Sequence, residues 1–315
     1  MKKISLVTKG LLTYIPGLLS LRPAGGTGGT DSAVYCYGVW MKHLALLAHH
    51  GAAVPPRAVV ELGPGDSLGI GLCALLSGAD KLYALDVSPF AAAEQNVQIF
   101  DALVQLFHNR APRPMQGWPD FDPLLGSDLY PSAILTEEVL RHSLARDRLQ
   151  RLRRALVEPQ APVSDICIRY IVPWPHHKDF ATGSIDLVIS HAVLEYVSDL
   201  QELYASCRQW LRPGGMMSHQ IDFGAHALAT CWNGHLSYPE WLWRLIVGRR
   251  EVTISRMLCA DHLRAIRAAG FEIVCELHHH RSDGLQREQL ARRWRQDNEA
   301  DLTCAELFVQ ARQGL

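Results

Sequence analysis

The stretch AVVELGPGDSLGIGLCALLSGADKLYALD, residues 58–86, decides the fold of this chain. Its apolar run at 58–62 predicts a short buried strand, and Gly63-Pro64-Gly65 predicts the tight turn that follows. Residues 67–77 then carry the apolar spacing of a helix, and residues 81–85 predict a second strand. Strand, glycine turn, helix and strand within about 30 residues form a βαβ unit, which implies a parallel sheet.

Acidic residues flank the glycine turn. The glycines let the backbone come close to a ligand, because no Cβ intervenes, and the helix N-terminus offers free N–H groups. The turn alone would also suit a nicotinamide or flavin cofactor. Glu61 and Asp66, however, would repel a pyrophosphate and attract a cation. Asp86 ends the second strand, where a carboxylate accepts hydrogen bonds from both ribose hydroxyls.

Four blocks, in order along the chain, resemble the class I S-adenosylmethionine-dependent methyltransferases. They are residues 61–69 (ELGPGDSLG), 85–88 (LDVS), 183–197 (GSIDLVISHAVLEYV) and 211–215 (LRPGG). The resemblance implies an α/β fold: a Rossmann-like, doubly wound sheet of seven strands, mostly parallel with an antiparallel last strand. It also implies S-adenosylmethionine as the cofactor.

The same resemblance assigns cofactor-binding residues. Gly63 and Gly65 would cradle the amino-acid part of the cofactor, Glu61 would lie near its ammonium group, Asp86 would hold the ribose and Val87 would touch the adenine. The implied set is Glu61, Leu62, Gly63, Pro64, Gly65, Asp66, Ser67, Asp86, Val87, Ser190 and His191, the last two beside the transferred methyl.

The chain departs from the family after its third strand. There Ile171-Val172-Pro173-Trp174-Pro175 lacks the acid that often contacts the adenine amino group in the family. Backbone groups or stacking on Trp174 are the alternatives.

The chain divides into a helical segment, residues 1–54, and a methyltransferase domain, residues 55–315. Later strands are predicted at 167–172, 185–190 and 215–221, with an antiparallel hairpin of 271–277 and 305–311 at the sheet edge. Two stretches, at about 98–160 and 223–258, do not belong to the strand–helix alternation. We interpret both as helical insertions that cover the carboxyl end of the sheet.

The N-terminus imitates a signal peptide, because Met1-Lys2-Lys3 precedes an apolar stretch. Lys9 and Pro16 interrupt that stretch, and no clean cleavage site follows. An amphipathic segment packed on the domain is the preferred interpretation, and peripheral membrane contact is the alternative. No later stretch is apolar for long enough to span a bilayer.

Charge and cysteine usage narrow the function classes. Lys and Arg number 31 against 32 Asp and Glu, for a net charge of -1, so nucleic-acid binding is disfavoured. The 8 cysteines have no C-x-x-C spacing, which gives no support for a metal site and suggests a reducing, cytoplasmic compartment. The sequence sets neither the acceptor nor the oligomeric state.

Candidate catalytic residues end the fourth and fifth predicted strands, where ligands of parallel sheets bind. His219 is the preferred general base, because its ordinary pKa lies near neutrality; the alternative is that it only shapes the pocket. His191 would contact cofactor or acceptor, and Asp222 would orient a histidine or bind a sugar hydroxyl. A metal set of His219, Asp222, His226 and His235 is a minor alternative.

Three further clusters have a structural and a functional interpretation. Aromatic residues in the second insertion predict a cap core or, alternatively, a wall for a sugar-like acceptor. These residues are Trp232, Tyr238, Trp241 and Trp243. The arginines between 141 and 154 suit a solvated helix face, with an anionic acceptor as the alternative. His278-His279-His280 is interpreted as a solvated turn.

The sequence therefore predicts methyl transfer to a small-molecule or glycan acceptor at oxygen. The alternatives are an NAD(P)-dependent oxidoreductase on the same fold and a non-catalytic binding module. A looser resemblance, to uncharacterised bacterial methyltransferases that occur with surface-polysaccharide genes, rests on residues 25–37, 218–223 and 232–235.

Overall fold

A computed structural model of the chain describes residues 2–15, 28–114, 117–158, 165–174, 182–250 and 252–314. Its seven-stranded sheet has the order β3-β2-β1-β4-β5-β7-β6. The strands are β1 (Ala58–Leu62), β2 (Lys81–Leu85), β3 (Cys167–Ile171), β4 (Ile185–His191), β5 (Leu211–Asp222), β6 (Phe271–His280) and β7 (Cys304–Gln313). β1 to β5 pair in parallel, and β7 pairs antiparallel with both β5 and β6. This confirms the expected fold class.

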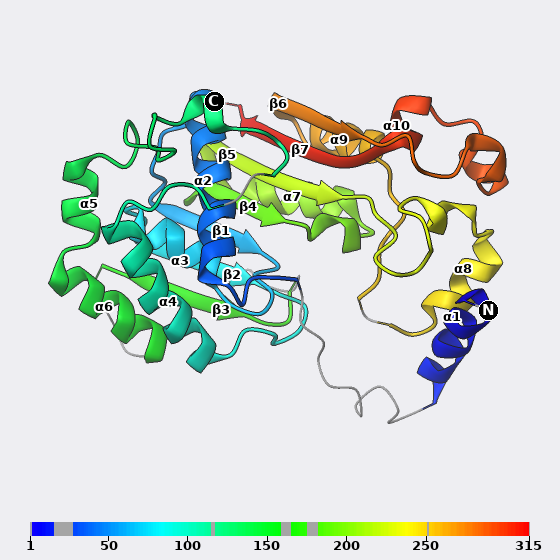
Figure 1. The fold of residues 1–315 in the computed structure, drawn as a ribbon, viewed down its shortest axis with the longest axis horizontal. Coiled ribbons are helices and arrows are strands. Elements are labelled where there is room, and N and C mark those ends of the chain that lie inside the picture. Colours follow the sequence, from blue (N-terminus) through cyan, green and yellow to red (C-terminus); the bar gives the residue numbers. More distant parts are fainter. Residues whose placement is uncertain are drawn as a thin grey trace.

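Helices cover both faces of the sheet (Figure 1). α2 (Ala33–His49), α3 (Gly69–Leu76) and α4 (Ala93–His108) share one apolar core with the sheet. α7 (Leu200–Trp210) and α9 (Cys259–Ala268) share the other. All five residues of β1 are buried, as expected for a parallel strand covered on both faces.

The helical part of the first insertion packs at the opposite end of the sheet from the one we expected. It contains α5 (Glu137–Ser143) and α6 (Arg146–Val157). The buried guanidinium of Arg148 donates to the carbonyl oxygens of Leu75 and Ala79 and pairs with Asp80, immediately before β2. These contacts place α6 at the amino end of the strands, which corrects the expectation for this helical part of residues 98–160; Trp118, earlier in the same stretch, stacks on His279 near the carboxyl end of β6.

The second insertion, residues 223–258, lies beyond the carboxyl ends of the strands, beside the N-terminal helix (Figure 1). α1 (Lys2–Leu11) packs against α8 (Glu240–Val247). A Cβ on Gly10 would lie 1.9 Å from the carbonyl oxygen of Leu245, so only glycine permits this approach. Leu6 joins Tyr238 and Trp243 in a small core. The amphipathic N-terminus therefore packs on the domain, and these two aromatic residues form a cap core.

The connections contain short elements. These are α10 (Glu299–Thr303) and 3-10 helices at Leu12–Tyr14, Asp122–Leu124, Leu194–Tyr196, Gly234–Ser237, Arg287–Gln289 and Arg292–Trp294. Within the described residues, every helix is too short or too polar to cross a membrane. Peripheral membrane contact stays a prediction. Residues 25–27 and Pro175, which entered the sequence argument, lie outside the described residues.

The run His278-His279-His280 belongs to β6 and is not a solvated turn, because it pairs with Leu307, Glu306 and Cys304 of β7. The strand is longer than the apolar pattern indicated, since histidines on a half-buried edge interrupt that pattern. This difference brings histidine side chains next to groups on β7 and α9.

Candidate functional site

The glycine turn joins β1 to α3 in a conformation that needs glycine. Gly63 and Gly65 have φ angles of 63° and 73°, which residues with a Cβ rarely adopt. A Cβ on Gly63 would lie 2.6 Å from the methyl carbons of Val193. The Gly65 amide donates to Asp86 at 3.3 Å, so the turn and the end of β2 hold each other in place.

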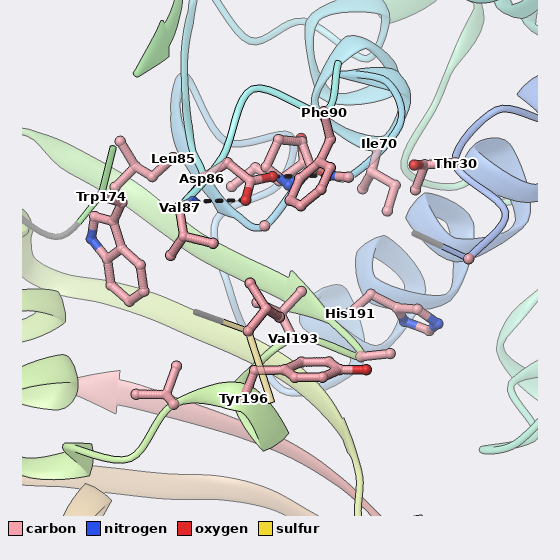
Figure 2. Close-up of a pocket in the computed structure, with 18 of the residues that line it drawn as sticks. Thr30, Ile70, Leu85, Asp86, Val87, Phe90, Trp174, His191, Val193 and Tyr196 are labelled. Carbon is pink, nitrogen blue, oxygen red and sulfur yellow. Dashed lines mark hydrogen bonds between the residues drawn. The ribbon is translucent and has the colours of Figure 1, made fainter. Parts of the chain in front are cut away.

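A cavity of about 420 Å³ opens at the carboxyl ends of β1, β2 and β4. Val87 and Trp174 stand at one end of it and His191 and Tyr196 at the other, with Asp86 between (Figure 2). Glu61, Gly63, Pro64 and Gly65 also line it. Among the described residues that line the cavity there is no lysine or arginine.

Glu61 places a buried carboxyl group in this lining. Its Oε2 accepts a hydrogen bond from the Gly71 amide at 3.0 Å. Burial raises the pKa of Glu61 to about 8, because the carboxylate loses its water. A cationic group bound beside it would favour the ionised carboxylate and pair with it.

Asp86 is oriented by the backbone. Its Oδ1 accepts from the Val87 amide at 2.7 Å, and its Oδ2 accepts from Gly65. Burial raises the pKa of Asp86, and these hydrogen bonds oppose that rise. A carboxylate held by two amides in a cavity wall is suited to accept hydrogen bonds from a diol.

Four residues of the expected cofactor set do not line the cavity: Leu62, Asp66, Ser67 and Ser190. The Leu62 side chain is in the core. The Asp66 amide and the Ser67 hydroxyl bind Thr30, which itself lines the cavity. These residues fix the loop before α2, and sequence reasoning missed Thr30 because it is distant from the motif.

His219 lies outside the cavity, which argues against it as the general base. It pairs with Ser190 in the sheet register, and its Nδ1 is 2.8 Å from the Ser190 hydroxyl. The ring is fully buried near Tyr204, and burial lowers the pKa of His219 to about 3. Successive strand residues face opposite sides, so ending the correct strand does not suffice to reach the site.

His191, one residue beyond Ser190, does line the cavity. Among the residues that the structure describes, its Nδ1 has no hydrogen-bond partner, and the rings of Tyr35 and His43 make T-shaped contacts with its ring at 6.0 and 5.8 Å between centroids. Burial and then the charge of Lys42 lower the pKa of His191 to about 3. The imidazole is therefore neutral and has a free polar atom.

A second cavity, of about 380 Å³, is lined largely by polar residues. Its wall includes Asp222, His226, Trp232, His279, Arg281 and Glu306. The His226 ring stands 5.5 Å from that of Tyr196, which lines the first cavity. The two cavities thus share a wall at Tyr196 and His226.

Acids surround His226. Its Nε2 lies 3.6 Å from Asp222 Oδ2 and 3.8 Å from Glu195 Oε1. The Glu195 carboxyl is buried, and burial raises its pKa well above the ordinary range. His226 and Ala227 have φ angles of 41° and 66°, a costly conformation for non-glycine residues that occurs often at functional sites.

A hydrogen-bonded chain reaches the wall of the second cavity at Glu306 and His279. Lys42 Nζ donates to Gln220 at 2.9 Å, and Gln220 donates to Glu306 at 2.6 Å. Glu306 lies 3.1 Å from His279, on which Trp118 stacks. These residues come from five separate segments, so no local pattern pointed to them.

The predicted metal set is not brought together. Asp222 and His226 are neighbours, but His219 faces the other side of the sheet and binds Ser190. His235 is buried beside Trp243, with 6.5 Å between the rings. This separation argues against the set.

A family model described as "Methyltransferase domain" matches residues 128–218. No curated protein matches the chain. Solved structures with a similar fold include an S-adenosylmethionine-dependent methyltransferase from Mesorhizobium loti, at 17% identity over 90% of this chain and 100% of that chain, with a TM-score of 0.39. Phosphoethanolamine N-methyltransferase 2 of Haemonchus contortus, in complex with S-adenosylmethionine, is 14% identical over 92% of this chain and 58% of that chain, with a TM-score of 0.43. An S-adenosylmethionine-dependent methyltransferase from Methanosarcina mazei is 10% identical over 85% of this chain and 97% of that chain, with a TM-score of 0.45.

The first cavity fits S-adenosylmethionine. Two buried acids face a space without lysine or arginine among its described lining, which suits a cation that also carries a ribose diol. The pyrophosphate of a dinucleotide would meet the same acids with no compensating cation, which argues against the oxidoreductase alternative.

Proposed function

Because the chain is a methyltransferase that uses S-adenosylmethionine, we propose that it methylates a hydroxyl group of a small polar acceptor, such as a sugar unit of a glycan. The observation that carries this proposal is the second cavity, whose polar wall adjoins the first at Tyr196 and His226. Donor and acceptor would meet where the cavities adjoin, and the Tyr196 and His226 side chains would turn aside there, because the acceptor oxygen must contact the methyl group in line with its bond to sulfur. Oriented polar groups in a concave site are what selects a small hydrophilic ligand.

The first cavity would hold the donor. Gly63 and Gly65 would admit its amino-acid part, Glu61 would pair with its ammonium group, and Asp86 would bind the ribose. Val87 and Trp174 would enclose the adenine. Stacking on these side chains would take the place of the contact that an acid after β3 often makes in the family. S-adenosylmethionine, when bound, supplies an activated methyl group, so the protein's main task is to align a nucleophile and exclude water.

His226 would accept the proton of the acceptor hydroxyl. Its Nε2 lies 3.6 Å from Asp222 Oδ2, so that carboxylate can accept the Nε2 proton and orient the ring, which leaves Nδ1 to accept the proton of the acceptor hydroxyl. His191, whose imidazole is neutral, would accept a hydrogen bond from the cofactor bound in the first cavity. This assignment replaces His219 by a histidine that faces a cavity.

A glycan acceptor has separate support. The stretches 218–223 and 232–235, on which the chain resembles methyltransferases that occur with polysaccharide genes, supply Asp222 and Trp232 to the second cavity. Carboxylates accept hydrogen bonds from sugar hydroxyls, and an indole offers a flat apolar face with one donor.

The test is turnover of His226→Asn. We expect kcat to fall by about 10²- to 10⁴-fold, the usual contribution of a general base, with the affinity for S-adenosylhomocysteine kept. The assay measures S-adenosylhomocysteine release with mono- and oligosaccharides, phenols, amines and carboxylates as acceptors. His108→Asn, an exposed histidine on α4, is the matched control. Methylation of amines only, or full turnover by His226→Asn, would contradict the proposal.

A further inference from the structure

A cluster of two thiols and one imidazole lies at the sheet edge, apart from both cavities. Cys259 begins α9, His278 lies on β6 and Cys304 begins β7. His278 Nδ1 is 3.5 Å from Cys259 Sγ and 3.8 Å from Cys304 Sγ. All three ligand atoms lie within 4.8 Å of one another, and both cysteines are at most 2% exposed.

These distances match a tetrahedral metal site. With Zn–S of about 2.3 Å and Zn–N of about 2.0–2.1 Å, a tetrahedral ion separates its sulfur and nitrogen ligands by about 3.6 Å. The two S···N distances bracket that value without any movement of the backbone. Thiolate and imidazole together are the ligands that zinc and related thiophilic ions prefer.

The second nitrogen of His278 has the partner that a ligating histidine needs. His278 Nε2 lies 3.0 Å from Glu276 Oε1, and Arg267 holds the other oxygen of Glu276 at 3.0 Å. A carboxylate on the far nitrogen fixes the tautomer that leaves Nδ1 free for a metal, and it orients the ring. The cluster therefore includes both ligands and their outer support.

We propose that Cys259, His278 and Cys304 bind one zinc-class divalent ion, which ties α9 to the β6–β7 hairpin. Binding would release the thiol protons to solvent as the thiolates coordinate. The cluster supplies three ligands among the described residues, so water would complete the tetrahedron on the side where His278 is 29% exposed. The site would be structural, because neither cavity includes its ligands.

The test titrates the metal-free, reduced full chain with Co²⁺ and then Zn²⁺. We expect one equivalent to bind, with intense visible bands of tetrahedral Co²⁺, a thiolate charge-transfer band in the near ultraviolet, and loss of both when Zn²⁺ is added. Cys304→Ser and His278→Ala should remove the bands. Glu276→Gln should weaken binding by about 10- to 100-fold, as outer-shell substitutions do.

Cys275→Ser is the matched control, because Cys275 is a buried free cysteine on the same strand, outside the cluster. It should keep the Co²⁺ spectrum. Thermal unfolding of wild type with and without Zn²⁺ gives a second readout, since an ion bound only by the folded state raises Tm.

Two results would overturn the proposal. One is wild-type protein that binds no Co²⁺ with tetrahedral bands. The other result has two parts. Wild-type chain that is isolated without reductant and then unfolded shows six reactive thiols, and shows eight only after reduction. The reduced chain also binds no metal. That second result would make Cys259 and Cys304 a disulfide pair instead.

Discussion

The two cavities differ in how the chain builds them. The first takes its two glycines and both of its buried acids from one contiguous β–turn–α–β unit, residues 58–86, and the rest of its wall is largely apolar apart from groups such as His191 and Tyr196. The second takes Asp222, Trp232, His279 and Glu306 from separate segments and combines acids, histidines and an arginine. A local motif can thus fix the donor, whereas acceptor selection depends on residues that only the fold brings together.

The largest expected effect on ligand binding comes from removing the charge of Asp86 in the first cavity, which we call the donor cavity. For Asp86→Asn we expect affinity for S-adenosylhomocysteine to fall by about 100-fold, because charge-assisted hydrogen bonds to the ribose diol are lost. Calorimetric titration measures this, and circular dichroism checks the fold. Asp66→Asn is the control, since Asp66 does not line the cavity. Equal losses in both variants would show that the ribose assignment is wrong.

The contrast explains which parts of the site the sequence could predict. Glu61, the two glycines and Asp86 are adjacent in sequence to the elements that position them, so pattern and position coincide. His219 satisfied the rule that ligands bind at strand ends, but side-chain parity turns it to the α7 face, and only the pairing register reveals that. Phe90 and Tyr35 also line the cavity and carried no signal beyond being apolar.

Fold prediction had the same limit. Apolar runs located the strands, since parallel strands buried on both faces are nearly all apolar. The position of residues 98–160 depended on Arg148, whose helix looked solvated, yet whose guanidinium binds carbonyl oxygens before β2. Burial of one arginine among several exposed ones follows from tertiary packing, which composition does not encode.

The next effect is a pH dependence that only the donor cavity should show. Glu61 has a pKa of about 8 in the ligand-free fold, so it is protonated at pH 7, and pairing with a cation requires it to ionise. Affinity for S-adenosylmethionine should rise roughly tenfold per pH unit up to about pH 8 and then level off, with one proton released on binding near pH 7. Titration in buffers of different ionisation enthalpy counts that proton.

Glu61→Gln should bind S-adenosylmethionine with an affinity that does not change with pH over this range.

The same pKa also predicts how the stability of the ligand-free protein depends on pH. The folded pKa of Glu61 lies above its ordinary 4.5, so the folded state holds more protons between those pH values. Its contribution to the free energy of unfolding therefore falls as pH rises through that window. A wild-type affinity that does not change with pH would remove Glu61 as the partner of the cation.

A smaller effect separates two histidines that differ by which face of the sheet they occupy. His191→Asn should lower kcat by about tenfold, since it removes a polar group from the wall of the first cavity. His219→Asn should leave kcat per folded molecule within about threefold and instead lower the free energy of unfolding by about 1–3 kcal/mol, through the lost contact with Ser190. Denaturant unfolding and initial rates, measured on both variants, distinguish the two roles. The reverse pattern would restore His219 as the base.

The smallest expected effect concerns the second cavity, which we call the acceptor cavity. It tests whether the aromatic side chain in the wall of this cavity contributes to binding of the acceptor. Trp232 lines that cavity, and its buried Nε1 donates to no other residue that the structure describes, so an acceptor hydroxyl could satisfy it. Trp232→Phe keeps an aromatic face but removes the donor, and one lost hydrogen bond of about 1 kcal/mol should raise the acceptor KM by roughly fivefold with donor affinity unchanged. Trp241→Phe is the control, because Trp241 is 66% exposed on α8 and lines neither cavity. If both variants keep the wild-type KM, the indole of Trp232 belongs to the scaffold, and the polar chain from Lys42 to His279 must select the acceptor by itself.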